Sequence, residues 1–540
     1  MAQVQPASLT GDSGQHPRAY EPVTLVLAIL LSVLGAVIGL HLVTTLGISA
    51  NTSVIGALIA MLVGRVGFAG LRSMRSVHRQ NLAQSAISAA TFAAANALLT
   101  PIAVPYAFGR PDLVWPMLIG SACGLAVDAW VLYRIFDSTF LPATNAWPPG
   151  VAAAETIVAG DRGGRRAIIL AAGGAVGLAG SWLGLSMSAA GVAFIGNMWA
   201  LGMFGVGLLI GQYEPGLLHV DLAEQYIPQG VMIGAGIIAL GQAGVLLARR
   251  RRNRTPATEN GEHDPSAEAT VDERQLRRSL VSGFFLFVGG AIVLALATGL
   301  YAQMSVPLLV GWILLAGFAA IVHEIIVGLA AMHAGWFPAF AVSLIFLILG
   351  LVIGIPALPL AILVAYCAST GPAFADMGYD FKAGWMLRRN RRPWTAFELA
   401  GRRQQFTSAL VGCAVALGTV ALLWHTYFDN GQIPPFATVY ADSIKAGLSS
   451  PGATVNLVLW AIPGAAIQLI GGPKRQMGIL LATGLLIATP NAGWLVLGAL
   501  LIRVIYRKVR GPEGETELFL VGAGIIAGDS IAATAQIVRS

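Results

Sequence analysis

The chain has 540 residues, of which 56% are hydrophobic and only 11% are charged, and its mean hydropathy is +0.73. Soluble domains carry about 25% charged residues, so the composition excludes a soluble globular protein and indicates a polytopic integral membrane protein embedded in the lipid bilayer. The net charge of +7 gives no support for nucleic-acid binding, because most basic residues lie in short loops, as the positive-inside rule predicts. The three cysteines all lie in apolar segments, which gives no support for a disulfide framework.

The chain begins with a polar stretch, residues 1–22, which we expect to be a disordered cytoplasmic N-terminus rather than a cleavable signal. The apolar runs 23–45 and 53–70 are each long enough to cross about 30 Å of hydrocarbon. The basic stretch that follows, residues 71–80, should be cytoplasmic.

The next predicted helix, residues 81–105, combines small residues with polar ones, among them Asn81, Gln84 and Ser85. Small residues let helices approach closely, and amides can form hydrogen bonds between helices. Two interpretations remain open, a packed central helix and a helix that lines a substrate path.

Two acidic residues follow in unusual places. Asp128 falls inside the next span, where a carboxylate is a functional candidate by default, although an ion pair with Arg134 is an equal alternative. Residues 140–160 contain too many prolines for a simple span and end in a short helix that starts at a Pro-Pro pair. We expect a re-entrant or interfacial element, in which Glu155 either pairs with a nearby arginine or faces the path.

Residues 249–278 form the one clear linker. Basic flanks enclose an acidic, polar middle that cannot bury enough apolar surface to fold, and the flanks belong on the cytoplasmic side. The linker divides the membrane part into two halves, residues 23–248 and 279–540.

The second half contains a segment, residues 356–384, that starts as an apolar helix and then becomes polar. Gly371 and Pro372 break it beside small polar side chains. At membrane depth such breaks are tolerated only where protein or a water-filled cavity satisfies the freed backbone groups. We therefore predict a discontinuous helix that lines a polar path, as in secondary transporters.

The remainder of the second half contains a basic stretch, residues 383–405, that we expect to be a cytoplasmic loop, followed by further apolar spans. In all we expect about 14 to 16 transmembrane helices with one or two re-entrant elements. Small-residue polar helices stand at 81–100 and 361–376, one in each half. This pattern predicts two pseudo-repeated halves with a site at their interface.

Five stretches, NLAQSAISAA at 81–90, the proline-rich 141–160, YDFKAGWML at 379–387, RRQQF at 402–406 and FLVGAGIIAGDSI at 519–531, resemble the oligopeptide transporter (OPT) superfamily. That superfamily includes oligopeptide carriers and the yellow stripe-like metal-chelate carriers. The likeness covers most of the chain in the same order. It implies a proton-coupled secondary transporter that imports small peptides or metal complexes of chelators across the cytoplasmic (inner) membrane, with an all-helical fold and a homodimeric assembly.

The family motifs fall on particular residues of this chain: Asn81, Gln84 and Ser85 in the polar helix, Pro149, Gly150 and Glu155 in the proline-rich turn and the helix after it, Asp380, Lys382 and Gly384 in the Asp-Leu-Lys-Thr-Gly signature, and Gly528, Asp529 and Ser530 in the late Gly-Glu-Ser. The chain departs from the pattern in LPATNAWPPG, which has lost an acidic residue, and at Ala383, where the family has threonine. The choice between peptide and chelate therefore stays open.

Candidate roles follow from the chemistry of transport. A charged peptide or chelate needs well-placed polar groups in a dry surround, and the candidates for substrate contact are Asn81, Gln84, Ser85, Tyr366, Ser369 and Thr370. Proton coupling needs an acidic or imidazole group whose pKa differs between outward and inward states, and the candidates are Asp128, Glu155, Asp376, Asp380, His323 and Glu324. The alternatives are a surface charge pair at a loop end for Asp380 and Lys382, and an interfacial pair at a helix end for His323 and Glu324.

The sequence gives little support for an enzyme. The zinc motif His-Glu-x-x-His fails because Val327 stands where the second histidine belongs, and no P-loop occurs, so we predict no bound metal, no cofactor and no enzymatic activity. The other hypothesis is a passive channel or a membrane scaffold, which acid-stimulated, saturable uptake would exclude. We expect amide variants of Asp376 or Glu155 to lose pH-driven accumulation, and deletion of residues 256–270 to leave transport intact.

Overall fold

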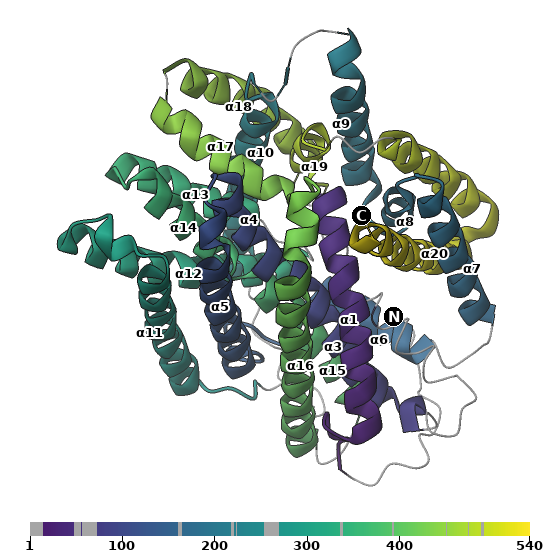
Figure 1. Cartoon of the computed structure of the whole chain (residues 1–540). Coiled ribbons are helices and arrows are strands. Elements are labelled where there is room, and N and C mark those ends of the chain that lie inside the picture. The colour runs from purple at the N-terminus through teal and green to yellow at the C-terminus, as the bar shows by residue number, and fades with distance from the viewer. Residues whose placement is uncertain are drawn as a thin grey trace.

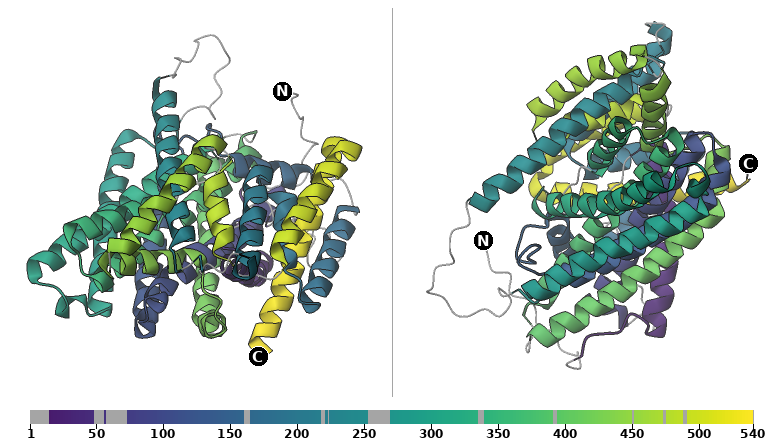
Figure 2. Two further views of the ribbon diagram at one scale, coloured as in Figure 1. Left: turned by 90° about the horizontal axis from the view of Figure 1, so that it is seen from above. Right: turned by 90° about the vertical axis from the view of Figure 1, so that its left-hand side faces the viewer.

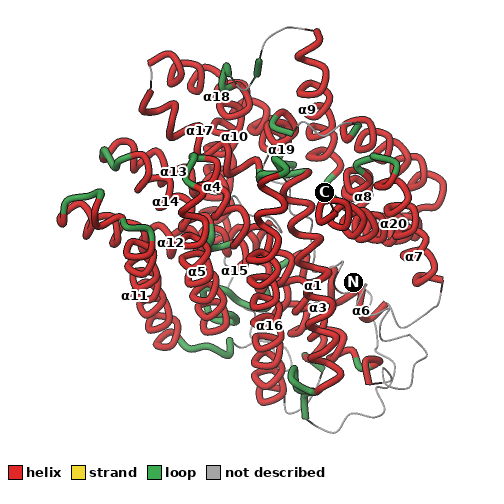
Figure 3. The backbone as a smooth tube through the Cα atoms, in the orientation of Figure 1, coloured by secondary structure: helices red, strands yellow, loops and turns green. Residues whose placement is uncertain are grey.

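The computed structural model describes residues 15–47, 56, 73–159, 165–217, 221–222, 224–252, 269–334, 339–390, 394–449, 451–472, 475–487 and 491–539. Across these ranges the chain is helical (Figure 3), and its β-type pairing within the described residues is an isolated bridge between Ser138 and Val271. The predicted all-α fold is confirmed.

The helices are arranged as Figure 1 shows. In chain order they are α1 (Pro22–Thr45), α3 (Val77–Phe92), η2 (Ala93–Leu99), α4 (Thr100–Ala107), η3 (Pro111–Leu113), α5 (Val114–Ile135), α6 (Pro148–Ala159), α7 (Arg165–Trp182), α8 (Met187–Ile195), α9 (Met198–Leu217), α10 (Ile227–Arg252), α11 (Glu273–Ala297), η6 (Leu300–Ala302), α12 (Val306–Ala334), α13 (Ala339–Ile353), α14 (Ala357–Ala368), α15 (Pro372–Arg388), α16 (Trp394–Asp429), α17 (Pro435–Ser449), α18 (Pro451–Gly471), α19 (Met477–Leu485) and α20 (Ala492–Arg539).

Seven helical stretches of the described residues are long and apolar enough to cross a membrane, and four shorter apolar helices accompany them. The seven are Pro22–Thr45, Val77–Ala107, Pro111–Ile135, Glu273–Ala297, Val306–His333, Ala357–Arg388 and Trp394–Asp429. The expected apolar run 53–70 lies outside the described residues. The total of 14 to 16 crossings and the repeat of the two halves stay predictions.

Two of the seven are far more buried than the others. Val77–Ala107 is 94% buried over its most apolar window and Ala357–Arg388 is 89% buried, whereas the next is 61%. These are the two segments that the sequence singled out as rich in small and polar residues. The first contains the π-helix η2, a form that is rare and frequent at functional sites.

The second central segment is discontinuous, as predicted. α14 ends at Ala368 and α15 begins at Pro372, with Gly371 between them at φ 88°. A side chain at this position would be strained, and a Cβ atom would lie 2.8 Å from Nδ1 of His323. The break thus depends on a residue without a side chain.

Several segments predicted to be cytoplasmic meet at one end of the bundle, where α1 and α16 begin in Figure 1. Arg79 donates to Glu21 at 2.5 Å, the backbone N–H of Ala19 donates to Gln404 at 2.9 Å, and Arg402 donates to the Thr270 hydroxyl at 3.0 Å. These contacts join the N-terminal stretch, the 71–80 stretch, the linker end and the 383–405 stretch. The packed part of the chain therefore begins before Pro22.

The end of the linker is also packed. Residues 253–268 lie outside the described residues, but the backbone N–H and hydroxyl of Thr270 donate to Asp137 at 3.2 and 2.8 Å. A deletion of 256–270 therefore removes a buried contact, whereas a shorter deletion that ends before Thr270 does not.

We expect removal of residues 256–266 to leave uptake and the melting temperature unchanged, because the contacts of Thr270 remain. Removal of 256–270 should lower the melting temperature, since Asp137 and Arg402 lose a buried partner. Melting curves of the two purified variants check this. Equal melting temperatures would show that the Thr270 contact contributes nothing.

A second group of helices, α7, α8, α9, α19 and α20, packs around its own apolar cluster, which the end of α1 joins. α20 lies beside α7 and α8 (Figures 1 and 2) and is broken at Gly511, where φ is 66°. α8 has nine residues, which span only about 14 Å, too short to cross the bilayer.

Candidate functional site

Polar side chains of α3 face carboxylates of α15 in the middle of the bundle. Asn81 Nδ2 donates to Gln84 Oε1 at 3.0 Å, and Gln84 Nε2 donates to Asp380 Oδ1. Ser88 Oγ donates to both carboxylate oxygens of Asp376, at 2.8 and 2.9 Å. All five side chains are buried. The two segments singled out in the sequence therefore form one buried polar cluster, named here the α3–α15 cluster.

A third helix completes this cluster through Gln405 of α16. Its Nε2 atom donates to Ser85 Oγ at 3.1 Å and to the backbone oxygen of Asp380 at 2.8 Å, while Oε1 accepts from Arg388 at 2.7 Å. Gln405 lies in RRQQF, one of the stretches that resemble the family, but sequence reasoning gave it no role, because residues 383–405 were taken as a basic loop. The stretch is instead the start of α16, and Gln405 is fully buried.

The start of α15 is bound by a carboxylate from another helix. Asp128 of α5 accepts hydrogen bonds from the backbone N–H groups of Gly371, at 2.9 Å, and Phe374, at 2.8 Å. Negative charge at a helix N-terminus is stabilised by the helix dipole and the free N–H groups. The Arg134 guanidinium lies instead 6.0 Å from the Trp130 ring. Asp128 thus acts as a helix cap supplied by a neighbouring helix.

His323 and Glu324 lie inside α12, fully buried, and not at a helix end. Nε2 of His323 is 2.8 Å from the backbone oxygen of Ala339, so this nitrogen carries a proton and donates. Neither carboxyl oxygen of Glu324 has a hydrogen-bond partner among the described residues, and Asp128 is its charged neighbour. A buried carboxyl without partners is unusual, because desolvation of its ionised form is costly.

The hydroxyl groups around the helix break bind backbone carbonyls. Tyr366 donates to the oxygen of Phe287 at 2.9 Å, Ser369 to that of Tyr366 at 2.7 Å, and Thr370 to that of Cys367 at 2.9 Å. These side chains satisfy carbonyl groups of the broken helix and of α11. The path-lining residues named from sequence thus divide between the α3–α15 cluster and this break.

The remaining predicted residues lie apart from these groups. Lys382 is buried within α15, donates to the backbone oxygen of Ala143 at 2.7 Å and lies 4.5 Å from the Trp385 ring. It and Asp380 are therefore not at the surface end of a loop. Glu155 is exposed on α6, whose apolar face packs against Ala383 of α15.

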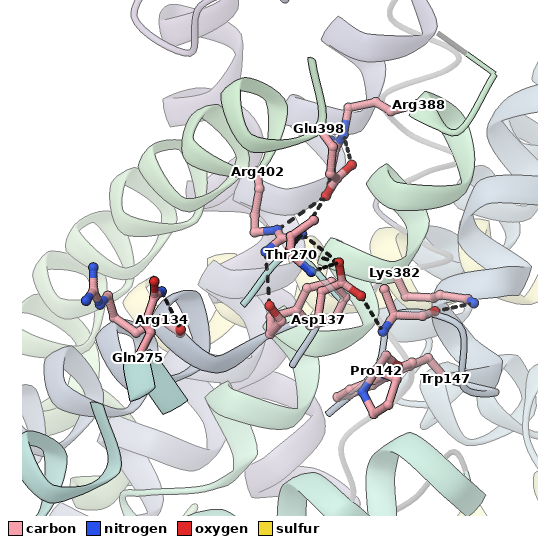
Figure 4. Close-up of polar contacts among 12 residues, drawn as sticks. Arg134, Asp137, Pro142, Trp147, Thr270, Gln275, Lys382, Arg388, Glu398 and Arg402 are labelled. Atoms are coloured by element: carbon pink, nitrogen blue, oxygen red, sulfur yellow. Dashed lines mark hydrogen bonds and ion pairs between the residues drawn. The ribbon is translucent and has the colours of Figure 1, made fainter. Parts of the chain in front are cut away.

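Figure 4 shows a buried ion network formed by Arg388, Glu398, Arg402 and Asp137. It adjoins the α3–α15 cluster through the hydrogen bond from Arg388 to Gln405. Glu398 accepts from Arg388 at 2.7 Å and from Arg402 at 3.1 Å, and Arg402 also reaches Asp137 at 3.4 Å. Burial raises the pKa of Asp137, and the Arg402 charge opposes this rise. Sequence reasoning placed both arginines in a solvated loop. The sequence feature that could have indicated this network is the spacing of four residues between Glu398 and Arg402, which places the pair on one helix face.

The N-terminal stretch covers this network with a buried imidazole. His16 packs 5.3 Å from Phe397 and lies next to Gly401 of α16. Burial, and then the charge of Arg388, lower the pKa of His16 to about 4. His16 is therefore neutral at pH 7 and adds no further positive charge beside the two arginines.

Comparison with known proteins identifies the family of this chain, but no individual curated protein gives a significant match. A family profile described as OPT oligopeptide transporter protein matches residues 22–217 and 182–538, which is most of the chain. Together with the candidate membrane spans, this match shows that the chain belongs to the OPT oligopeptide transporter family, a family of multi-pass membrane transporters and not of enzymes.

Proposed function

We propose that this chain is a proton-coupled secondary transporter that imports small peptides or metal-chelate complexes across the cytoplasmic membrane. The observation that carries the proposal is the α3–α15 cluster, in which amides and carboxylates are buried between the two most enclosed helices, one of them broken. Ionisable groups inside membrane helices are costly to keep and mark pathways for ions or substrates. Family membership supports the carrier over the passive channel and the scaffold.

For substrate contact we propose Asn81, Gln84 and Ser85. Their amide and hydroxyl groups bind one another, Asp380 and Gln405, and can exchange these bonds for those of a peptide or a chelate. Tyr366, Ser369 and Thr370, at the helix break, have a different set of partners, namely backbone carbonyls.

The contacts of Tyr366, Ser369 and Thr370 with backbone carbonyls favour the support of the discontinuous helix. We propose that these residues meet the substrate only when the break rearranges.

For proton coupling we propose Glu324 first, with Asp128 as the charge that it senses. Its carboxyl is buried, has no hydrogen-bond partner among the described residues and lies near Asp128, so its protonation can change once water or a partner reaches it. Asp376 and Asp380 remain candidates through their place in the cluster, and His323 through its contact with Thr370. The exposure of Glu155 gives it the weakest support.

Glu324→Gln should abolish accumulation driven by a pH gradient, because the amide cannot release a proton, while exchange of labelled for unlabelled substrate continues. Both activities can be measured in proteoliposomes containing the purified variant. Glu155→Gln serves as the exposed comparison and should accumulate substrate normally. Full accumulation by the Glu324 variant would remove this residue from the coupling mechanism.

The function itself is tested by uptake into proteoliposomes under an imposed pH gradient, with a labelled tripeptide and a ferric or ferrous chelate offered in parallel. We expect saturable accumulation of one of them that collapses with the gradient, and this result also selects the substrate class. Uptake that does not saturate and ignores the gradient would favour the channel. Absence of uptake for both would favour the scaffold.

We further propose a homodimer, which the family likeness supports. The proposed cytoplasmic location of the linker agrees with the meeting of the basic segments at one end of the bundle.

A further inference from the structure

A second buried acid–base pair lies outside the α3–α15 cluster. Nε2 of His41, near the end of α1, is 3.2 Å from Oδ2 of Asp529 on α20. Both side chains are buried, with 7% and 3% of their surfaces exposed. The two residues are 488 positions apart in the sequence, and their contact joins the end of α1 to the second helix group.

The pair lies at the N-terminus of the short helix α8. The backbone N–H of Ser188 donates to the same carboxylate oxygen of Asp529 at 2.6 Å. At the other end of α8, Arg503 donates to the backbone oxygens of Ala193, at 3.1 Å, and Gly196, at 2.6 Å. α20 thus places a negative charge at the start of α8 and a positive charge at its end, the arrangement that a helix dipole favours.

Unpartnered polar atoms surround this point. Nδ1 of His41, Oγ of Ser188 and Oγ of Ser530 are buried, and none has a hydrogen-bond partner among the described residues. A helix N-terminus is here combined with an ion pair and three unused polar atoms. Such a group is more polar than packing alone requires.

His41 is the charged group that acts on Asp529. His41 is the one titratable residue in the sequence of α1, and α8 has none. On α20, Glu515 binds Arg503 and Glu517 binds the Tyr506 hydroxyl. Cys413 of α16 lies near Asp376 and Asp380 of the α3–α15 cluster, and near Asp128 at the start of α15. The α3 helix, which also packs against α1, has His78 and Arg79 at its start, where Arg79 binds Glu21 and His78 lies beside His16. The α9 helix, which packs against α20, has Tyr213 and Glu214 near its end, whereas α7 (from residue 168) and η2 contribute no titratable side chain.

We propose that His41 and Asp529 form a second proton-binding site, which holds its proton on the imidazole while α1 is in contact with α8 and α20. The inference rests on the proposed transport function and adds a site to it.

The chemistry of the site follows from charge balance. With neutral His41 the pair has one buried negative charge, which the N-terminus of α8 only partly offsets. A proton taken up at Nδ1 makes the pair neutral overall, whereas separation of α1 from α20 leaves the imidazolium without its carboxylate and releases the proton. Imidazole is the side chain suited to this exchange between pH 5 and 8. Movement of the second helix group against α1 would thus change proton binding.

The test compares the pH dependence of stability in the full-length protein and in His41→Gln. The melting temperature should fall in the variant by about 1–3 °C more at pH 5.5 than at pH 8.5, because a protonated imidazole stabilises the pair only at the lower pH. Asp529→Asn should show the same direction. The double variant should lose no more of the pH dependence than either single variant.

His425→Gln is the matched control, because His425 and Asp429 form a pair four residues apart on α16 that is 60% and 65% exposed. Its pH dependence should equal that of the unmodified protein. A difference between His41→Gln and the unmodified protein that is constant with pH would overturn the site and leave a structural contact only. This readout needs no substrate, so failure of the proposed transport function would be seen separately in the uptake assay.

Discussion

Replacing Glu398 with glutamine should destabilise the protein by about 3–5 kcal/mol, the range found when one partner of a buried ion pair is removed. Glu398 binds both Arg388 and Arg402, and all three side chains are buried. The amide removes the negative charge between the two guanidinium groups, and of the two only Arg402 keeps a carboxylate partner among the described residues, Asp137 at 3.4 Å. For a chain of 540 residues the purified variant should melt about 3–4 °C below the unmodified protein, or should be lost during solubilisation.

The matched control for this experiment is Asp112→Asn. Asp112 binds Arg110 at 2.6 Å, but the two side chains are 57% and 41% exposed. Exposed pairs of this kind contribute about 0–1 kcal/mol, so the control should melt close to the unmodified protein. Similar melting temperatures for the two variants would mean that water reaches the Glu398 network.

Replacing Asp128 with asparagine should reduce transport at least tenfold at every pH, in exchange as well as in accumulation. The carboxylate accepts from two N–H groups at the start of α15, whereas an amide offers one oxygen and presents an NH₂ group to the second N–H. The unsatisfied group costs about 1–3 kcal/mol. Asp376 and Asp380 follow on the same helix, so a shift at its start displaces the carboxylates of the α3–α15 cluster.

The measurement that separates the roles of Asp128 is exchange at equal pH on both sides. A residue that only couples protons would lose accumulation and keep exchange, and that outcome would contradict the positioning role. Asp272→Asn is the matched control, because Asp272 caps the exposed start of α11 by accepting from the N–H of Gln275 at 2.6 Å. Asparagine and aspartate are nearly equal as exposed caps, so this variant should transport normally.

The parts of the site that could be predicted from sequence are those with a local signal. Gly371 and Pro372 predicted the break between α14 and α15, and the polar, small-residue stretches predicted the two most buried helices. Asp128 was selected because an acidic residue inside a span is rare. Its role as a helix cap could not be predicted, because the N–H groups that it binds come from a helix 243 residues later.

The parts that were not predicted have a common cause. Charged residues in short basic stretches were assigned to solvated loops, and for most of them this rule is sound. Arg388 and Arg402 depart from it because Glu398 lies between them and offsets their charge within the protein. The family likeness had selected Asp529, but its contact with His41 could not be predicted, because the two residues are 488 positions apart in the sequence.

The dependence of the first half on the second has a consequence for how the chain is synthesised. Asp128 and Asp137 enter the membrane region early, but Gly371 and Arg402, which bind them, are made 243 and 265 residues later. Until then Asp128 lacks the N–H groups at the start of α15, and Asp137, although the N–H of Ala143 already donates to it, lacks the charge of Arg402. The first half therefore cannot reach its final packing alone, and we expect a chain that stops at the linker to accumulate less than the full-length protein.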